Sequence, residues 1–145
     1  MPFVDKRNAH SKDYHKTIEA ISLTNKCPFC RENFIYHKHP ILKQTNGWFI
    51  TKNSWPYKNT RFHFLILNYL HRTALSELNA DDYLAISQLA SWAIKEYKIK
   101  GGAVAFRFGD TKVTGSTVGH IHAHFIVPKI NPKTRRAFVV NFPVG

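Results

Sequence analysis

The sequence predicts an α+β domain with a mostly antiparallel sheet. Strand-like segments stand before and after one long amphipathic segment, and they are short and rich in aromatic and β-branched residues. Strands that are grouped, instead of alternating regularly with helices, favour an α+β architecture. The chain has 145 residues, 43% of them hydrophobic, which suits one globular domain with a core of its own.

The first half of the chain predicts one helix and several short strands. We expect an amphipathic helix over about residues 12–23. Aromatic and β-branched content then predicts strands over 34–36, 48–51 and 62–67. One helical turn is expected over 75–78.

A longer helix is predicted over residues 80–97. Asn79 is a suitable N-cap, Asp81 and Asp82 would lie in the first turn, and Gly101 follows as a stop signal. Apolar residues recur at helical spacing, at Leu84, Ile86, Leu89, Ala93 and Ile94. After this helix we expect paired strands over 103–108 and 120–127 around a loop over 109–119, and a final strand over 137–141.

The strand predicted over 120–127 carries the most informative pattern of the chain. Its histidines, His120, His122 and His124, alternate with apolar residues. Side chains at i, i+2 and i+4 share one face of a strand, so these imidazoles would form a row about 13 Å long. The other face, toward the core, would carry Ile121, Ala123 and Phe125. Imidazoles are costly to bury without partners and can act as nucleophile, proton carrier or metal ligand, so this row is the first candidate site.

The formal net charge of +12 would attract polyanions such as nucleotides, polyphosphate or nucleic acid. Basic residues are densest just after the histidines, at Lys129, Lys133, Arg135 and Arg136. A solvated surface without a polyanion partner is an equally good interpretation of the charge.

The longest apolar run, near 64–67, is too short to cross a bilayer, and residues 1–11 lack the apolar core of a signal peptide. Two cysteines do not make a disulfide framework, so we expect a cytoplasmic location and no membrane partner.

Cys27 and Cys30 have the spacing of two zinc ligands from one turn. A redox dithiol and two unremarkable buried cysteines are the alternatives. Zinc needs two further ligands, and His37 with His39 is the local possibility. The distant possibility is His71 with one histidine of the row.

Two further segments are considered as candidate parts of a functional site. Residues 109–117 combine glycines, hydroxyls and a lysine, which suits close approach to a phosphate, although most such segments are ordinary loops. His63 lies in an otherwise apolar strand, where a histidine is more often a core residue than a catalyst.

Together these residues resemble the histidine-triad (HIT) family, in its zinc-bearing bacterial form. His-Ile-His-Ala-His-Phe-Ile, from His120 to Ile126, is similar to the family's motif of histidines alternating with apolar residues. The strand from His63 to His71, the segment Gly115-Ser116-Thr117-Val118-Gly119 and the amino-terminal Cys-x-x-Cys also match in order and spacing. The resemblance implies a HIT-like fold and a single domain over 1–145, with an extension over 1–26, a core over 27–128 and a tail over 129–145.

The resemblance also implies a nucleotidyl hydrolase that acts at an α-phosphate. His122 matches the nucleophile, which would form a nucleotidyl-histidine intermediate, and His124 matches the residue at the phosphate or leaving group. Histidine at 124, where transferase branches have glutamine, favours hydrolysis. His63 matches a histidine that orients the triad, and His120 completes the catalytic set.

Nucleotide and phosphate would be bound by Asn53, Ser116, Thr117 and Arg107. Asn53 lies near the residue that binds the ribose hydroxyls, and Ser116 and Thr117 match residues that hold phosphate oxygens. Arg107, in Arg107-Phe108-Gly109, departs from the family's Asn-x-Gly, and Ser116 replaces its usual glutamine. Arg107 could bind a longer polyphosphate or a nucleic-acid end, or be a surface ion-pair partner.

In zinc-bearing members the ligands correspond to Cys27, Cys30, His71 and His120, so the resemblance implies a structural zinc that the chemistry does not require. A zinc-ligand set in which His37 or His39 replaces one of these histidines stays open. The resemblance also implies a homodimer.

Dinucleoside polyphosphates and nucleoside phosphoramidates are the leading substrate classes. An aprataxin-like deadenylase of nucleic-acid ends and a non-catalytic nucleotide-binding module are the alternatives. A third alternative is that the three histidines bind one metal ion. It is unfavourable because the backbones of residues i and i+4 on a strand lie about 13 Å apart.

Overall fold

The computed structural model describes residues 2–145 and is built on a five-stranded antiparallel sheet. Its strands, in the spatial order β1-β2-β3-β5-β4, are β1 (Ile41–Thr45), β2 (Trp48–Lys52), β3 (Thr60–Asn68), β5 (His122–Pro128) and β4 (Ala103–Arg107). The helices are α1 (Lys12–Ser22), α2 (Ala80–Glu96) and α3 (Thr111–Thr114), with 3-10 turns at Lys6–Asn8, Arg31–Asn33 and Leu75–Glu77. Within residues 2–145, no helix has the length and apolar character needed to cross a membrane.

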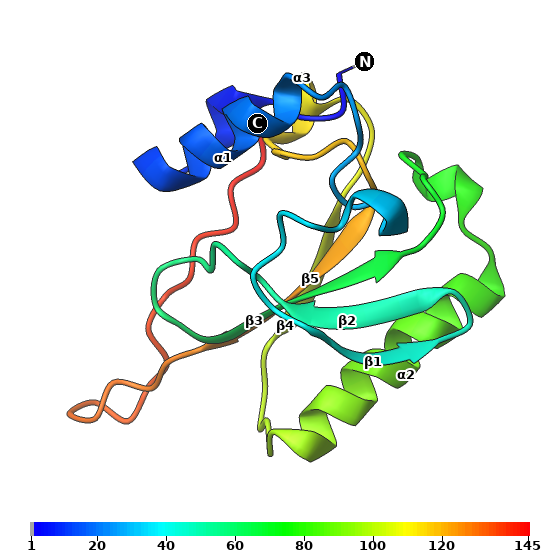
Figure 1. Cartoon of the computed structure of the whole chain (residues 1–145). Helices are drawn as coiled ribbons and strands as arrows, with labels where there is room; N and C mark the ends of the chain where they lie inside the picture. Colours follow the sequence, from blue (N-terminus) through cyan, green and yellow to red (C-terminus); the bar gives the residue numbers. More distant parts are fainter. Residues whose placement is uncertain (1) are drawn as a thin grey trace.

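The sheet has two unlike faces. Helix α2 covers one face, and the main core forms where its apolar stripe meets the inward side chains of β2, β3 and β5 (Figure 1). Alternation along β3 and β5 places His63, His122 and His124 on the other face. On that side lie α1, α3 and the carboxy-terminal segment (Figure 1). The candidate site is therefore on the face that α2 leaves free.

Asp82 fixes the start of α2 against the sheet. Its carboxylate accepts hydrogen bonds from Trp48 Nε1 at 2.9 Å, from Arg72 Nη1 at 2.8 Å and from the backbone amide of Asn79 at 2.9 Å. The side-chain oxygen of Asn79 in turn accepts a hydrogen bond from the backbone amide of Asp82, so the two residues form a capping box. The carboxylate is buried, and these donors satisfy its charge.

Much of the predicted order of elements is confirmed. The structure contains the expected helices near 12–23 and 80–97, the turn near 75–78 and the strands near 48–51 and 62–67. The strands near 103–108 and 120–127 are antiparallel neighbours, as expected, with Arg107 opposite His122. Ala123 and Phe125 face the core. The predicted α+β class with a mostly antiparallel sheet is correct.

Two predicted strands are wrong. Residues 34–36 follow a 3-10 turn, and Ile35 is 80% exposed, so its apolar side chain marks no buried strand face. Residues 137–141 contribute only an isolated bridge between Ile130 and Ala137, because the chain turns back there as a hairpin. The first strand lies instead at 41–45, where all side chains are exposed or half-buried and the apolar alternation of a strand is missing.

Two local details also differ from expectation. His120 precedes β5, which begins at His122, so the three histidines do not form one row on a strand. The segment expected as a loop contains α3, which Gly115 ends at φ +71°. At Gly115 a Cβ atom would meet the Gly145 carbonyl oxygen at 2.7 Å, so any larger residue would displace the carboxy-terminal segment.

Candidate active site and metal centre

A cavity of about 430 Å³ opens on the sheet face that carries the histidines. His122, His124 and Arg107 lie beside one another in the lining of the cavity, and Ser116 and Thr117 line it as well. Side chains of α1 and of the loop between β2 and β3 form much of the remaining wall, among them Tyr14, Trp55 and Tyr57. The rings of Tyr14 and Trp55 stack with centroids 5.1 Å apart. The cavity thus joins a polar, nitrogen-rich end to an aromatic wall, a combination suited to a phosphate and a flat apolar group.

His122 is held in one orientation. Its Nδ1 lies 2.7 Å from the carbonyl oxygen of His120. A carbonyl can only accept a hydrogen bond, so Nδ1 carries the proton and the lone pair is on Nε2. Burial lowers the pKa of His122 to about 4, which keeps the ring neutral near pH 7. A neutral imidazole with a free Nε2 has the electronic form of a nucleophile.

His63 and His124 form a second imidazole pair beside His122. Nε2 of His63 lies 2.8 Å from Nδ1 of His124, and the rings of His122 and His124 have centroids 4.7 Å apart. The backbone amide of Tyr57 donates to His63 Nδ1 at 3.1 Å. Burial lowers the pKa of His63 to about 3 and that of His124 well below its ordinary value. His63 is therefore part of the site and does more than fill the core.

Arg107 brings a buried cation to the same end of the cavity. Its Nη1 lies 3.1 Å from His124 Nε2, and its Nη2 donates to the hydroxyl of Tyr57 at 2.8 Å. The Pro143 carbonyl oxygen accepts from Nε at 2.8 Å and from Nη2 at 2.7 Å. The guanidinium is buried and, within residues 2–145, has no carboxylate partner. The structure thus excludes the surface ion-pair interpretation of Arg107.

The predicted phosphate-binding residues lie where the cavity meets the loop before β5. Ser116 is buried, and its hydroxyl donates to the Val118 carbonyl at 2.9 Å. Thr117 lines the cavity beside it. The side-chain amide of Asn8 donates to the carbonyls of Ser116 at 2.9 Å and Thr111 at 3.2 Å, which ties the amino-terminal segment to this loop.

Asn53 also lines the cavity, next to His63. Its side-chain oxygen accepts from the Trp55 amide at 2.9 Å, so its orientation is fixed. Its Nδ2 lies 3.3 Å from Nε2 and 3.5 Å from Nδ1 of His63, which places the amide beside the imidazole at nearly equal distances from both ring nitrogens.

Sequence reasoning missed several residues of this site. Tyr57 contacts His63, His124 and Arg107, yet its sequence neighbourhood indicates only an aromatic turn. Phe142 packs against Arg107, with the guanidinium carbon 3.9 Å from the ring centroid, and against His124. No local pattern shows that the carboxy-terminal segment or α1 reaches the site, because both contacts depend on the tertiary fold.

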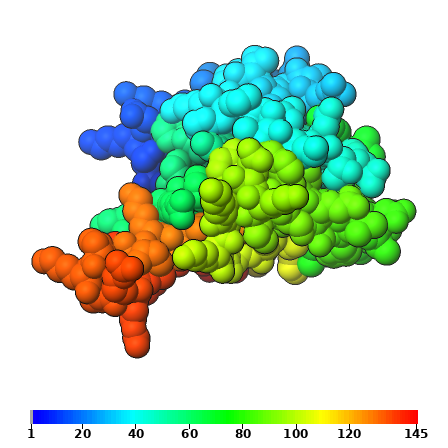
Figure 2. All heavy atoms as spheres, turned by 90° about the horizontal axis from the view of Figure 1, so that it is seen from below, coloured from blue at the N-terminus to red at the C-terminus, as the bar shows by residue number. Residues whose placement is uncertain are grey.

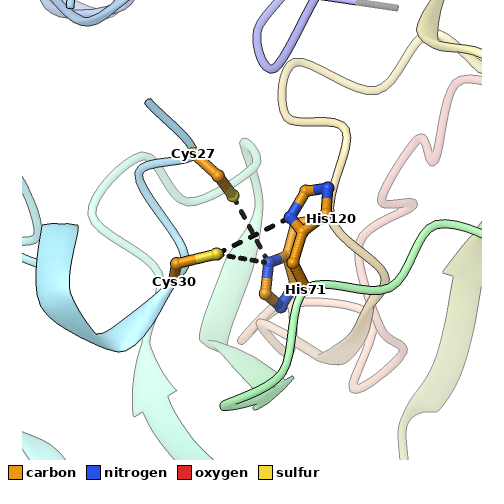
Figure 3. Close-up of side chains that lie close together, drawn as sticks. All are labelled: Cys27, Cys30, His71 and His120. Carbon is orange, nitrogen blue, oxygen red and sulfur yellow. Dashed lines mark hydrogen bonds between the residues drawn. The ribbon is translucent and has the colours of Figure 1, made fainter. Parts of the chain in front are cut away.

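A second cluster lies beside the first and contains Cys27, Cys30, His71 and His120 (Figure 3). One ligand atom from each lies within 4.8 Å of all the others. Sγ of Cys27 is 3.4 Å from His120 Nδ1, and Sγ of Cys30 is 3.6 Å from His71 Nδ1. His120 Nε2 lies 2.9 Å from the Asn68 carbonyl oxygen, which leaves Nδ1 free to face the thiols. Two thiols and two imidazole nitrogens at this spacing fit a tetrahedral zinc ion.

The alternative ligands lie elsewhere. His37 Nε2 is 2.8 Å from the Thr51 hydroxyl and Nδ1 is 3.2 Å from the Ser54 hydroxyl, so both ring nitrogens are engaged away from the cysteines. His39 is exposed, with its ring 6.1 Å from that of His37. The structure therefore brings His71 and His120, and not His37 and His39, to the cysteine pair.

No protein-family model matches the chain, and no curated protein matches it in sequence. Solved structures do match it. A HIT family hydrolase from Clostridium thermocellum is 20% identical with a TM-score of 0.55, and the match covers 74% of this chain and 93% of that one. A histidine triad protein from Clostridium difficile is 18% identical with a TM-score of 0.54, and the match covers 72% and 91%. A Plasmodium falciparum diadenosine triphosphate hydrolase is 21% identical with a TM-score of 0.51, and the match covers 63% and 62%. The chain therefore has the histidine-triad fold that its motif predicts.

Proposed function

We propose that this chain is a nucleotidyl hydrolase that cleaves a phosphoanhydride or phosphoramidate bond at the α-phosphate of a nucleotide conjugate. The observation that carries the proposal is the neutral His122, whose Nδ1–H is held by the His120 carbonyl while the ring faces the cavity. Dinucleoside polyphosphates and nucleoside phosphoramidates are the small substrates that we expect. The fold shared with a diadenosine triphosphate hydrolase supports this choice.

The reaction proceeds in two displacements. His122 Nε2 attacks the α-phosphorus, the N–P bond forms, and the bond from phosphorus to the bridging oxygen or nitrogen breaks. His124 Nε2–H donates a hydrogen bond to the departing atom, which stabilises the negative charge that develops there. Water then attacks the phosphorus and the N–P bond breaks, which returns the electron pair to His122 Nε2, releases a nucleoside monophosphate and gives the proton of the water to solvent. His122 Nδ1 keeps its proton and donates it in a hydrogen bond to the His120 carbonyl oxygen throughout, which stabilises the positive charge of the intermediate.

The proton on His124 follows from its neighbours. The Tyr57 amide is a fixed donor to His63 Nδ1, so a neutral His63 carries its proton on Nε2 and donates to His124 Nδ1. A neutral His124 then carries its proton on Nε2, the nitrogen that faces Arg107. Two donors repel each other there, so Arg107 Nη1 moves to phosphate oxygens when a substrate binds, and His124 Nε2–H points at the leaving group.

Arg107 and the loop before β5 form the phosphate-binding part of the site. The buried guanidinium has no competing carboxylate in the described chain, so its charge is available to phosphate oxygens. Ser116 and Thr117 bring further polar groups to the lining of the same cavity. Asn53, beside His63, binds a ribose hydroxyl.

We also propose that Cys27, Cys30, His71 and His120 hold a structural zinc ion. The four ligand atoms converge, and both thiols are buried. Bound zinc would join the loop at 27–30 to the segment that leads into β5. His120 belongs to this cluster, and it reaches the chemistry only through the carbonyl that orients His122.

A homodimer formed along β4 completes the proposal. This strand is at the edge of the sheet, and Val104 on it is 44% exposed. Sedimentation of the purified protein at micromolar concentration tests it, with a species of twice the chain mass as the expected result.

Release of nucleoside monophosphate from diadenosine tetraphosphate and from an adenosine phosphoramidate tests the proposed reaction. We expect turnover by the wild type, loss of at least a thousandfold in His122→Ala and normal turnover in the control His39→Ala, which changes an exposed histidine. Undiminished turnover in His122→Ala would reject the mechanism. Tight nucleotide binding without turnover in any of the proteins would support a non-catalytic binding module instead.

A further inference from the structure

The amino-terminal segment before α1 pairs with the loop that precedes β5. Val4 and Val118 form an antiparallel bridge, and the Asp5 amide donates to the Thr117 carbonyl at 2.8 Å. These contacts hold the segment against the loop that carries the proposed phosphate-binding residues. Helix α1 follows directly, so its first turn is brought to the same part of the molecule.

Packing along α1 fixes the helix beside the cavity. The Tyr14 amide donates to the Ser11 hydroxyl at 3.2 Å, which caps the first turn. Farther along, Ile18 and Ile21 are buried in a second core cluster that also contains Val118. Figures 1 and 2 show the helix, in blue, beside the blue-green loop between β2 and β3. The first turn of α1 therefore has a defined position relative to the site.

Tyr14 lies in this first turn, and aromatic contacts fix its ring. The ring stacks on Trp55 with centroids 5.1 Å apart and planes inclined by 19°, and it meets the His10 ring edge-on at 5.2 Å. The Lys38 ammonium lies over the Trp55 ring, 3.7 Å from its centroid, so Trp55 is itself held in place. A ring fixed in this way carries its hydroxyl to one defined place.

The Tyr14 hydroxyl belongs to the phosphate-binding part of the cavity. Tyr14 lines the cavity together with Thr117 and Arg107. Burial raises the pKa of Tyr14 to about 12, and the neighbouring Thr117 hydroxyl and Arg107 guanidinium act in the opposite direction. The phenol is therefore protonated near pH 7. It is a neutral hydrogen-bond donor next to a buried cation.

Arg107 marks the side of the site from which the leaving group departs. Its Nη1 lies 3.1 Å from His124 Nε2, the nitrogen that donates to the departing atom in the proposed reaction. A guanidinium so close to this atom also lies close to the group bonded to it on the far side. In a polyphosphate that group is a second phosphate, whose oxygens accept hydrogen bonds from guanidinium and hydroxyl donors.

We propose that Tyr14, together with Arg107, binds the second phosphate of the substrate, the one that leaves with the bridging oxygen. The inference rests on the proposed function and assigns its leaving group to a polyphosphate chain. His122 Nε2 forms the bond to the α-phosphorus, and the bond from the α-phosphorus to the bridging oxygen breaks. That oxygen keeps the electron pair and leaves as part of the second phosphate. The Tyr14 hydroxyl and the guanidinium stabilise the negative charge that the phosphate gains.

A phosphoramidate cannot use this second-phosphate subsite. Its leaving group is an amine, which offers no phosphate oxygens to a hydroxyl or a guanidinium. A dinucleoside polyphosphate or a nucleoside triphosphate places an anionic phosphate there. Tyr14 therefore favours phosphoanhydrides among the two substrate classes that the histidines alone would accept.

Binding is measured by titration calorimetry in a His122→Ala background, with AMP, which ends at the α-phosphate, and with ATP, which continues beyond it. The variant is Tyr14→Phe, which keeps the ring on Trp55 and removes only the hydroxyl. The matched control is Tyr83→Phe, which removes a hydroxyl from an exposed tyrosine of α2 that does not line the cavity. Turnover of diadenosine tetraphosphate and of an adenosine phosphoramidate is then compared in the same variants with His122 intact.

We expect Tyr14→Phe to weaken ATP binding about tenfold and to leave AMP binding within about twofold, because only ATP reaches the second-phosphate subsite. Tyr83→Phe should change neither. In Tyr14→Phe the kcat/KM for diadenosine tetraphosphate should fall about tenfold, while that for the phosphoramidate stays within about twofold of the wild type.

Unchanged ATP binding in Tyr14→Phe would overturn the inference. Equal losses for AMP and ATP would overturn it too, since the hydroxyl would then contact the α-phosphate or the nucleoside. In either case, turnover of diadenosine tetraphosphate that depends on His122 would leave the proposed function intact. Selective loss of ATP binding, with no turnover of either substrate by the wild type, would instead reject the proposed function and with it the leaving-group role of Tyr14.

Discussion

The guanidinium of Arg107 donates two hydrogen bonds to the carbonyl oxygen of Pro143, at 2.8 and 2.7 Å. These two residues lie 36 positions apart in the chain, and their contact draws the carboxy-terminal segment over the histidine end of the cavity. The remaining donors of Arg107 face Tyr57 and His124. The same side chain thus closes one wall of the site and orients its partners.

We expect Arg107→Lys to lower kcat/KM by about 10- to 100-fold. A lysine keeps the charge but has no planar fork of donors, so it cannot bond Pro143, Tyr57 and phosphate oxygens in this geometry. Steady-state hydrolysis of diadenosine tetraphosphate measures the effect. Tyr57→Phe is the milder comparison, since it removes one acceptor and keeps the ring that stacks on His124. A value of kcat/KM in Arg107→Lys equal to the wild type would show that the guanidinium geometry is dispensable.

Cys27→Ser should remove bound zinc and lower the melting temperature by about 10 °C, because structural zinc contributes several kcal/mol to folding. Metal analysis of the purified protein and thermal unfolding by circular dichroism measure both effects. His71→Gln should behave in the same way. His39→Gln should change neither, since His39 lies away from the thiols. Zinc that is retained in His71→Gln but lost in His39→Gln would favour the local ligand set.

The unfolding free energy should fall as the pH drops below 6.5, partly through His63. Burial holds the pKa of His63 at about 3 in the folded protein, whereas in the unfolded chain it is near 6.5. Between these values the unfolded state binds the extra proton, so stability is present above pH 6.5 and is lost toward pH 3. At pH 5 the loss from this one group is about 2 kcal/mol.

Urea unfolding at pH 7.5 and pH 5.0 measures this effect, with His63→Gln as the comparison. The decrease between the two pH values should be smaller in the variant by about the contribution of this group. Buried histidines that do not contact His63 titrate in both proteins and cancel in the difference, whereas the pKa of His124, which His63 contacts, changes with the substitution. Identical decreases in the two proteins would mean that His63 is solvated in solution.

Local signals in the sequence explain which parts of the fold were predictable. Asn79, Asp82 and the apolar spacing that follows specify α2, and the alternation around Ala123 and Phe125 specifies β5. The strand predicted over residues 34–36 is wrong because Ile35 is apolar but exposed, and composition alone does not report burial. The strand at 41–45 was missed for the opposite reason: it is held by pairing with β2 and has no fully buried side chain.

In the candidate site too, some residues were predictable from the local sequence and others were not. The histidines and the cysteine pair are visible as motifs, because their spacing is local and their chemistry is uncommon. The contacts of Tyr57, Phe142 and Pro143 with the histidines and Arg107 are not visible, because they arise only when distant segments meet. His120 shows the same limit: in the sequence it belongs to the triad, while in the structure its ring turns to Cys27 and Cys30.

The covalent step at His122 is tested most directly by trapping it. Diadenosine tetraphosphate with a radioactive α-phosphate is mixed with excess protein and quenched in denaturant within milliseconds, and the label that remains on the protein is counted. We predict label on the wild type and on His39→Ala, at up to one nucleotide per chain, and none on His122→Ala. Hydrolysis by the wild type without labelled protein, or label that persists in His122→Ala, would contradict the account.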